Sequence, residues 1–152
     1  MTYNNGGKVQ IKKILIPIDG SEYSFNAARC AIKVAKNEKA KLYCIQVTSN
    51  IPYGYETPYA IDQYYKDLEQ KVQSWFDRVR KMAEKEGISE LKTETFTGVK
   101  SVIGSIIDYA TDRDIDLIVI GTRGRTGLKR FFMGSVANGV VQHAHCSVLL
   151  VR

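Results

Sequence analysis

The sequence predicts an α/β fold, a three-layer α/β/α sandwich around a five-stranded parallel sheet with strand order 3-2-1-4-5. Two observations support this. Five short, mostly apolar runs alternate with amphipathic helical segments along the 152 residues, and such alternation is typical of right-handed βαβ units in a parallel sheet. A glycine-rich stretch follows the fourth run. The length suits one domain, which we expect to span residues 11–152 after a flexible tail of residues 1–10.

The apolar runs differ in composition, and this difference predicts their order. They span residues 14–18, 42–47, 91–97, 117–120 and 148–151. The first, second and fourth are nearly continuous hydrophobic runs, which is typical of central strands covered on both faces. The third carries Lys92 and Glu94 and suits an edge of the sheet. The fifth then takes the opposite edge.

Four helices are expected between the strands. Ser21 can cap the first, Gly87 can end the second, and the others cover residues 102–110 and 136–144 by their apolar spacing. The second shows its spacing from Tyr65 to Met82 and includes Trp75 and Phe76, which we expect in the core. Residues 48–61, with two prolines and a glycine, indicate a long loop, which is a lid, a partner surface or a variable surface segment.

The predicted strand order has one topological switch point, between the first and fourth strands. Ligands of open parallel sheets bind beyond the carboxyl ends of the strands at such a point. The two loops that meet there begin at Asp19 and at Gly121. Asp19 can serve either as a ligand contact or as the cap of the first helix, a role for which Ser21 competes.

The glycines after the fourth strand predict an anion site. Gly121, Gly124 and Gly134-Ser135 form the pattern Gly-x-x-Gly-x(9)-Gly-Ser between a buried strand and a helix. Glycine permits positive φ and close ligand approach, and main-chain N–H groups of such turns and helix starts favour phosphate. The pattern is neither a Walker A loop nor a dinucleotide fingerprint. Basic residues between the glycines raise the positive potential there, namely Arg123, Arg125, Lys129 and Arg130.

Composition limits the partners. The net charge of +6, from 22 basic and 16 acidic residues, favours anionic ligands, but no nucleic-acid recognition signature occurs.

The sequence also predicts where the protein is found and which metal or redox sites it lacks. No apolar run approaches the ~20 residues of a membrane span, and no signal peptide is visible, so we expect a cytoplasmic protein. The three cysteines form no Cys-x-x-Cys pair. His143 and His145, two residues apart, do not have the spacing of a metal site.

These residues resemble the universal stress protein family, specifically its ATP-binding type with an adenine nucleotide alpha-hydrolase-like fold. The resemblance covers residues 10 to 152. It is carried by Ile14 to Ser21, by Asp116 to Gly121, by the glycine spacing and by the C-terminal Cys146 to Arg152.

The resemblance implies a bound ATP or another adenine nucleotide, commonly accompanied by Mg²⁺. It implies that Pro17, Ile18 and Asp19 line the nucleoside and that Val47 contacts the adenine. The ribose and phosphates would be surrounded by Gly121, Arg123, Gly124, Gly134, Ser135, Val136 and Ala137. Two positions depart from the family pattern: Ala137 stands where many relatives carry a hydroxyl residue, and Ser147 where relatives often have proline.

The fifth strand indicates how the protein assembles. An apolar strand at a sheet edge invites pairing, so we expect two subunits to meet at Ser147–Arg152, and the resemblance also implies a homodimer.

The leading hypothesis for the function is a regulatory nucleotide-binding protein of the stress response. A slow nucleotide hydrolase or phosphotransferase and a nucleotide-free interaction module are the alternatives. No catalytic residue is named, because neither loop offers a histidine or a positioned general base.

Overall fold

The computed structural model describes residues 10–51, 53–124 and 133–152. The expected tail lies outside the described residues except for Gln10, which is exposed and belongs to no helix or strand. Three residues of the basic stretch, Arg125, Lys129 and Arg130, also lie outside them.

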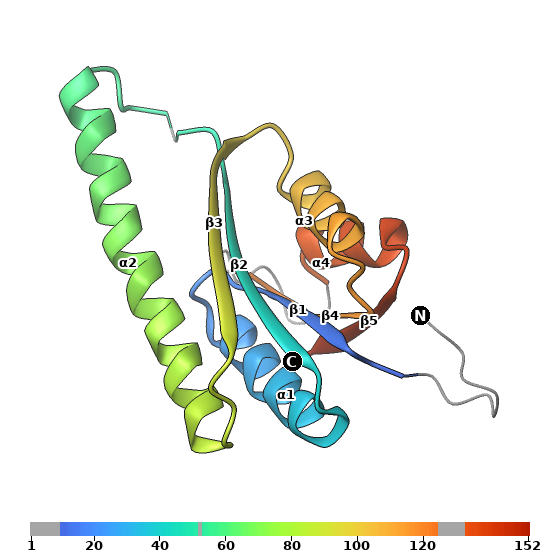
Figure 1. The fold of residues 1–152 in the computed structure, drawn as a ribbon. Helices are drawn as coiled ribbons and strands as arrows, with labels where there is room; N and C mark the ends of the chain where they lie inside the picture. The colour runs from blue at the N-terminus through green and yellow to red at the C-terminus, as the bar shows by residue number, and fades with distance from the viewer. Residues whose placement is uncertain (1–9, 52, 125–132) are drawn as a thin grey trace.

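Strands and helices alternate along the chain (Figure 1). In order they are β1 (Lys13–Pro17), α1 (Glu22–Glu38), β2 (Lys41–Ser49), α2 (Pro58–Lys85), β3 (Leu91–Val99), α3 (Val102–Asp112), β4 (Leu117–Gly121), α4 (Ser135–His143) and β5 (Ser147–Val151). The strands form one parallel sheet of order β3-β2-β1-β4-β5. The predicted strand order is therefore confirmed.

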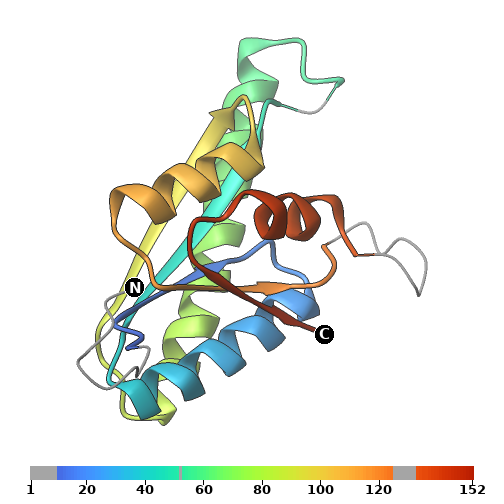
Figure 2. The same cartoon turned by 90° about the vertical axis from the view of Figure 1, so that its right-hand side faces the viewer.

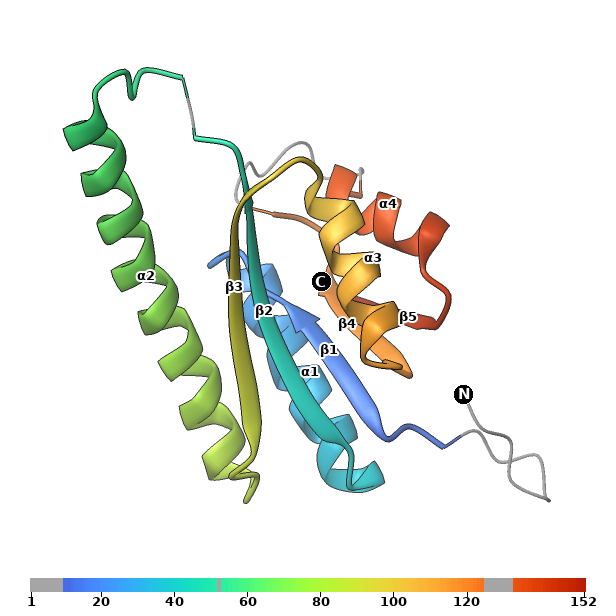
Figure 3. The same cartoon turned by 45° about the horizontal axis from the view of Figure 1, so that its top comes forward.

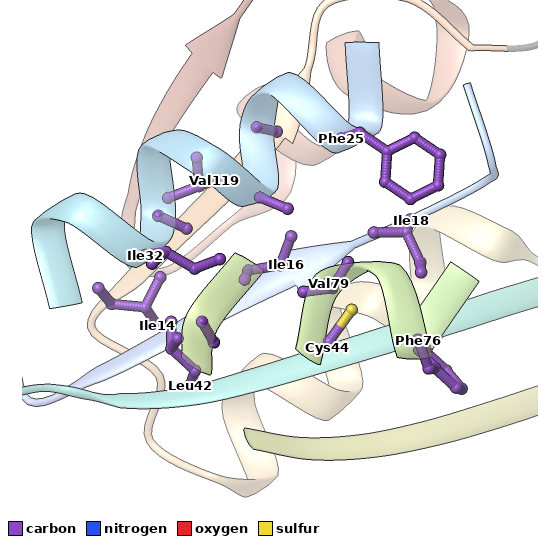
Figure 4. Packing of buried hydrophobic residues seen from close by; sticks show 14 of the residues in the cluster. Ile14, Ile16, Ile18, Phe25, Ile32, Leu42, Cys44, Phe76, Val79 and Val119 are labelled. Carbon is purple, nitrogen blue, oxygen red and sulfur yellow. The ribbon is translucent and has the colours of Figure 1, made fainter. Parts of the chain in front are cut away.

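Helices cover both faces of the sheet. Helices α1 and α2 lie on one face and α3 and α4 on the other (Figures 1 and 2). Alternation along the strands supplies each face with its own apolar cluster: Ile14 and Ile16 pack under α1 and α2, whereas Leu15 packs under α3 and α4. Figure 4 shows the first cluster, in which Phe76 and Val79 of α2 lie over the strands. The three-layer sandwich is thus confirmed.

The central strands are buried and the edge strands are not. Ile14 of β1 is aligned with Leu42 of β2 on one side and with Leu117 of β4 on the other, and all three are buried. The outer strand β3 consists of half-buried and exposed residues and contains no buried one. At the opposite edge, Leu149 and Leu150 of β5 are each 36% exposed. The polarity of the apolar runs therefore predicted their positions correctly.

Ser21 is the residue that caps α1. Its Oγ accepts a hydrogen bond from the Ser24 N–H at 3.2 Å. Asp19 lies two residues before Ser21 and fixes the position of that residue. Its Oδ1 accepts hydrogen bonds from the Ser21 N–H at 2.9 Å and from the Ser21 hydroxyl at 2.6 Å. Asp19 is therefore not the cap, and its carboxylate remains at the carboxyl end of β1.

Helix α2 starts earlier than its apolar spacing indicated. It begins at Pro58, with Thr57 as N-cap, and β2 continues to Ser49, so the expected loop over residues 48–61 is too long. Proline fits the first helical turn because its missing N–H would have no partner there. The extra turns carry α2 past α1 (Figures 1 and 3). Gly87, at φ 79°, ends the helix as predicted.

Length alone does not make α2 a membrane segment. It has 28 residues, with charged residues along most of its length. Within the described ranges, no helix combines the length and the apolar character that crossing a bilayer requires.

Candidate functional site

A cavity of about 450 Å³ opens where the carboxyl ends of β1, β2 and β4 meet the start of α4. Its volume is within the range of small-molecule sites. All eleven residues singled out in the sequence line it: Pro17, Ile18, Asp19, Val47, Gly121, Arg123, Gly124, Gly134, Ser135, Val136 and Ala137. Four separate segments of the chain supply these residues. The structure therefore brings the predicted set together at the predicted switch point.

The turn after β4 contacts two of the other segments closely. A Cβ placed on Gly124 would lie 2.8 Å from Asp19 Oδ2, in the loop after β1. A Cβ placed on Gly134 would lie 3.4 Å from the Thr122 carbonyl oxygen and 3.5 Å from the Arg123 Cα. The Gly134 N–H donates to that same Thr122 oxygen at 2.7 Å. This hydrogen bond fixes the start of α4 against the turn.

Gly121 and Gly124 allow a close approach of neighbouring groups, whereas a Cβ on Gly134 would make only ordinary contacts. Among the described residues, the glycines with positive φ are Gly20, Gly54, Gly87 and Gly98, so the three motif glycines do not use the positive φ that glycine permits. Gly121 is the clearest case of close approach. A Cβ there would lie 2.8 Å from the carbonyl carbon of Tyr23 in α1, so this glycine allows β4 to end against the main chain of that helix.

The first turn of α4 offers main-chain donors to the cavity. Gly134 is its N-cap and makes no side-chain capping hydrogen bond. The next three residues, Ser135, Val136 and Ala137, all line the cavity. N–H groups of a first helical turn have no partner within the helix, and the helix dipole makes this end positive. This end of the cavity can therefore bind an anion.

Cationic and metal-binding groups are few in the described part of the site. Arg123 lines the cavity, and its Nη1 donates to the Tyr23 hydroxyl at 3.3 Å. The described residues contain no group of three or more His, Cys, Asp or Glu side chains placed to hold a metal ion. His143 and His145 are engaged separately: Nδ1 of His143 lies 2.8 Å from the Gly139 carbonyl oxygen, and that of His145 lies 3.2 Å from Thr111 Oγ1.

Trp75 contributes to the site in a way that its sequence position did not indicate. It packs against the core as expected, but it also lines the cavity. Its indole lies directly on Gly20 and leaves no room there for a Cβ, and Gly20 has a φ of 81°. Phe76, the next residue, is 1% exposed and belongs to the core alone. Which of two adjacent aromatic residues reaches the cavity depends on the crossing of α2 over the sheet.

Other lining residues were also missed by sequence reasoning, namely Ser24, Gln46, Thr48, Ser49, Val102, Ile106 and Ile120. Most are polar residues at the end of β2 or apolar residues at the start of α3. One signal was available: Gln46 is the single strongly polar residue in the run 42–47, and it is only 4% exposed. Gln46 is thus a polar residue near the carboxyl end of a central strand, the end at which ligands of open parallel sheets bind.

Comparisons with known proteins find matches to both the sequence and the fold of the chain. The family model described as the universal stress protein family matches residues 10–152. A universal stress protein of Methanocaldococcus jannaschii is 40% identical over 147 residues, which cover 96% of this chain and 85% of the relative. Among solved structures, the universal stress protein UspA from Lactobacillus plantarum superposes with a TM-score of 0.78 at 29% identity, covering 95% of this chain and all of the other.

A second similar solved structure is a complex with a ligand. The universal stress protein from Archaeoglobus fulgidus in complex with dAMP has a TM-score of 0.61 at 24% identity and covers 95% of this chain and 100% of its own. At this identity the likeness shows the fold alone.

Proposed function

The chain belongs to the universal stress protein family, and from this premise we propose that it binds an adenine nucleotide, ATP or a close relative, and that occupancy regulates its contacts in a stress response. The observation that carries the proposal is that all eleven predicted residues line one cavity. Solved structures of similar fold support the ligand class, since one is described with cAMP, one with dAMP and one with AMP.

The phosphates bind at the start of α4. There the N–H groups of Ser135, Val136 and Ala137 donate, and the dipole of the helix stabilises negative charge. Ala137 offers no hydroxyl, so its contribution is limited to the main chain. Arg123 adds positive charge beside the turn.

The nucleoside binds toward the ends of β1 and β2. The Asp19 carboxylate accepts hydrogen bonds from the ribose hydroxyls, because Ser21 holds it at the cavity through Oδ1 and its Oδ2 lies beside Gly124. Val47, half-buried at the end of β2, contacts the base. The apolar part of the cavity wall, which includes Ile18 and Trp75, suits the faces of a purine ring.

Mg²⁺ fits this site only as a companion of the phosphates. Asp19 is the one carboxylate among the described lining residues, and no cluster of three potential ligands occurs in the described ranges. Mg²⁺ is commonly held by substrate phosphates and water with one or two carboxylates. It would neutralise phosphate charge here without a protein cage.

The protein pairs with a second copy through β5. This strand is hydrogen-bonded to β4 on one side and ends the sheet on the other. Leu149 and Leu150 leave apolar surface exposed at this edge. A two-fold contact between β5 strands would cover it.

Analysis of the molecules that co-purify with the native protein tests nucleotide binding directly. The purified protein is denatured, the released small molecules are identified by mass spectrometry, and calorimetry then compares ATP, ADP, AMP and cyclic AMP with GTP. We expect adenine nucleotide in the released fraction and measurable affinity for at least one adenine ligand. An empty protein without affinity for any of them at millimolar concentration contradicts the proposal and favours the interaction module.

Phosphate release distinguishes binding from catalysis. The same preparation is incubated with ATP and Mg²⁺, and inorganic phosphate is measured over hours, with Gly124→Val as the matched variant. We expect binding without sustained release. Steady release that Gly124→Val abolishes would identify a hydrolase at this site.

A further inference from the structure

Gly20 is a backbone position that can take more than one conformation. It lies between Asp19 and Ser21 in the loop after β1 and has a φ of 81°. Glycine adopts positive and negative φ about equally readily, so the native conformation at this position has to be fixed by the surroundings of the loop. That conformation decides where the next peptide group points.

The peptide group after Gly20 orients the Asp19 carboxylate. Its N–H is that of Ser21, which donates to Asp19 Oδ1 at 2.9 Å, and the Ser21 hydroxyl donates to the same oxygen at 2.6 Å. The other carboxylate oxygen, Oδ2, lies beside Gly124, and both residues line the cavity. A change of the Gly20 conformation would therefore move the donors that hold this carboxylate.

The indole of Trp75, on α2, packs on Gly20. The atoms nearest to a Cβ placed on Gly20 are Cε2, Cζ2 and Cη2 of that indole, all in its six-membered ring, and the most distant of the three, Cη2, would lie at 2.9 Å. The ring therefore occupies the space next to the Gly20 Cα and restricts the movement of this residue toward α2.

Helix α2 holds the indole in a defined position. Phe76 and Val79, next to Trp75 and one turn further along α2, are at most 1% exposed and belong to the cluster between α2 and the sheet (Figure 4). Trp75 is half-buried and packs against the same cluster. Because protein interiors are closely packed, the indole is a firm support for the loop.

We propose that Trp75 is a positioning residue for ribose recognition. Its indole holds Gly20, and this keeps the Asp19 carboxylate directed at the ribose of the bound nucleotide. The inference rests on the proposed nucleotide binding. Because Trp75 acts through Asp19, its effect depends on the ribose hydroxyl groups from which that carboxylate accepts. A residue that only lines the cavity, or only stabilises α2, would affect ligands with and without those hydroxyl groups alike.

The test compares two ligands that differ only in the ribose hydroxyl groups. Calorimetry measures the affinities of AMP and of 2′,3′-dideoxyadenosine 5′-monophosphate for the wild type, Trp75→Leu and Tyr64→Leu. Tyr64 is the matched control, since it is half-buried on α2 and packs against the same cluster but is not among the residues that line the cavity. We expect the wild type and Tyr64→Leu to prefer AMP by about tenfold, and Trp75→Leu by less than about threefold.

A double-mutant cycle separates action through Asp19 from direct contact with the ligand. Trp75→Leu and Asp19→Ala are combined, and AMP affinity is measured for the wild type, the two single variants and the double variant. We expect Trp75→Leu to weaken AMP binding by about threefold or more in the wild-type background, and by less than about 1.5-fold once Asp19 is alanine. Losses of equal size in the two backgrounds overturn the inference.

Thermal unfolding of the ligand-free variants shows first that they are folded. If Trp75→Leu does not fold, Trp75→Phe replaces it, because the smaller phenyl ring also lacks the indole atoms nearest to Gly20. An unchanged preference for AMP in the folded Trp75 variant overturns the inference, and so does a wild type that binds both ligands equally. A wild type that binds neither ligand contradicts the proposed function instead.

Discussion

The Asp19 carboxylate lies against Gly124, since a Cβ on that glycine would come within 2.8 Å of Asp19 Oδ2. This contact joins the loop after β1 to the turn after β4, two segments more than 100 residues apart in the sequence. Ser21 holds the opposite carboxylate oxygen through two hydrogen bonds. The predicted nucleoside half and phosphate half of the site are therefore in direct contact.

Gly124→Val should weaken nucleotide binding without unfolding the protein. The added side chain would push against the Asp19 carboxylate and enter the space beside the turn. Because Gly124 is not among the described glycines with positive φ, the substitution does not force valine into the left-handed region. We expect at least a tenfold loss of AMP or ATP affinity in calorimetry, with an unchanged far-UV circular dichroism spectrum. Unaltered affinity would show that the ligand lies elsewhere.

Gly121→Ala should destabilise the fold more than Gly134→Ala. At Gly121 the new methyl group meets the main chain of Tyr23 at 2.8 Å, which cannot move cheaply, whereas at Gly134 the nearest atom is 3.4 Å away. We expect Gly121→Ala to lower the free energy of unfolding in urea by about 1–3 kcal/mol and Gly134→Ala to change it by less than about 0.5 kcal/mol. Equal effects of the two substitutions contradict this account of the glycines.

The environment of Tyr109 leads us to predict that the folded protein loses stability at alkaline pH. Burial, followed by the hydrogen bond that its hydroxyl donates to Glu94 at 2.7 Å, raises the pKa of Tyr109 above its ordinary value of 10. The unfolded chain therefore loses this proton at a lower pH than the folded protein does. The stabilising contribution is complete below about pH 10 and declines as pH rises above that value.

Urea titrations between pH 8 and pH 11 check this behaviour. The free energy of unfolding should decline more steeply with pH in the wild type than in Tyr109→Phe, which has no phenol to ionise. Parallel curves for the two proteins would falsify the assignment.

Leu149→Asp should convert a dimer into monomers. Leu149 is 36% exposed on the edge strand β5, and a charge there opposes pairing with a second edge. Sedimentation equilibrium should report half the wild-type mass. Tyr59→Asp is the matched control, because Tyr59 is 78% exposed on α2 at the other side of the sheet, and its mass should equal that of the wild type. A monomeric wild type, or a variant of unchanged mass, refutes the β5 contact.

Residue polarity along the chain was sufficient to predict the fold. The continuous apolar runs around Ile14, Leu42 and Leu117 required central strands, and the polar run beginning at Leu91 required an edge. This order then located the switch point, and the glycine spacing located the same place independently. The start of α2 was misplaced because residues 58–64 carry little apolar periodicity, and their helix depends on the Thr57 cap and on Pro58.

Parts of the site depended on tertiary geometry that no local pattern contains. Trp75 and Phe76 are neighbours in α2, and only the position of α2 on the sheet decides that Trp75 reaches Gly20 and the cavity. The role of Gly121 was also hidden, since its partner is the main chain of Tyr23. Gln46 was visible as a polar residue in an apolar run, but its unpaired oxygen is a property of the folded surroundings.

A ¹H–¹⁵N NMR titration of the wild-type protein with AMP and ATP tests the central claim most directly, because it observes the main-chain N–H groups themselves. The account predicts that the largest shifts fall on Gly124 and on Ser135, Val136 and Ala137, and that ATP shifts the amides of α4 further than AMP does. Shifts that leave the first turn of α4 unchanged while the nucleotide is bound would contradict it.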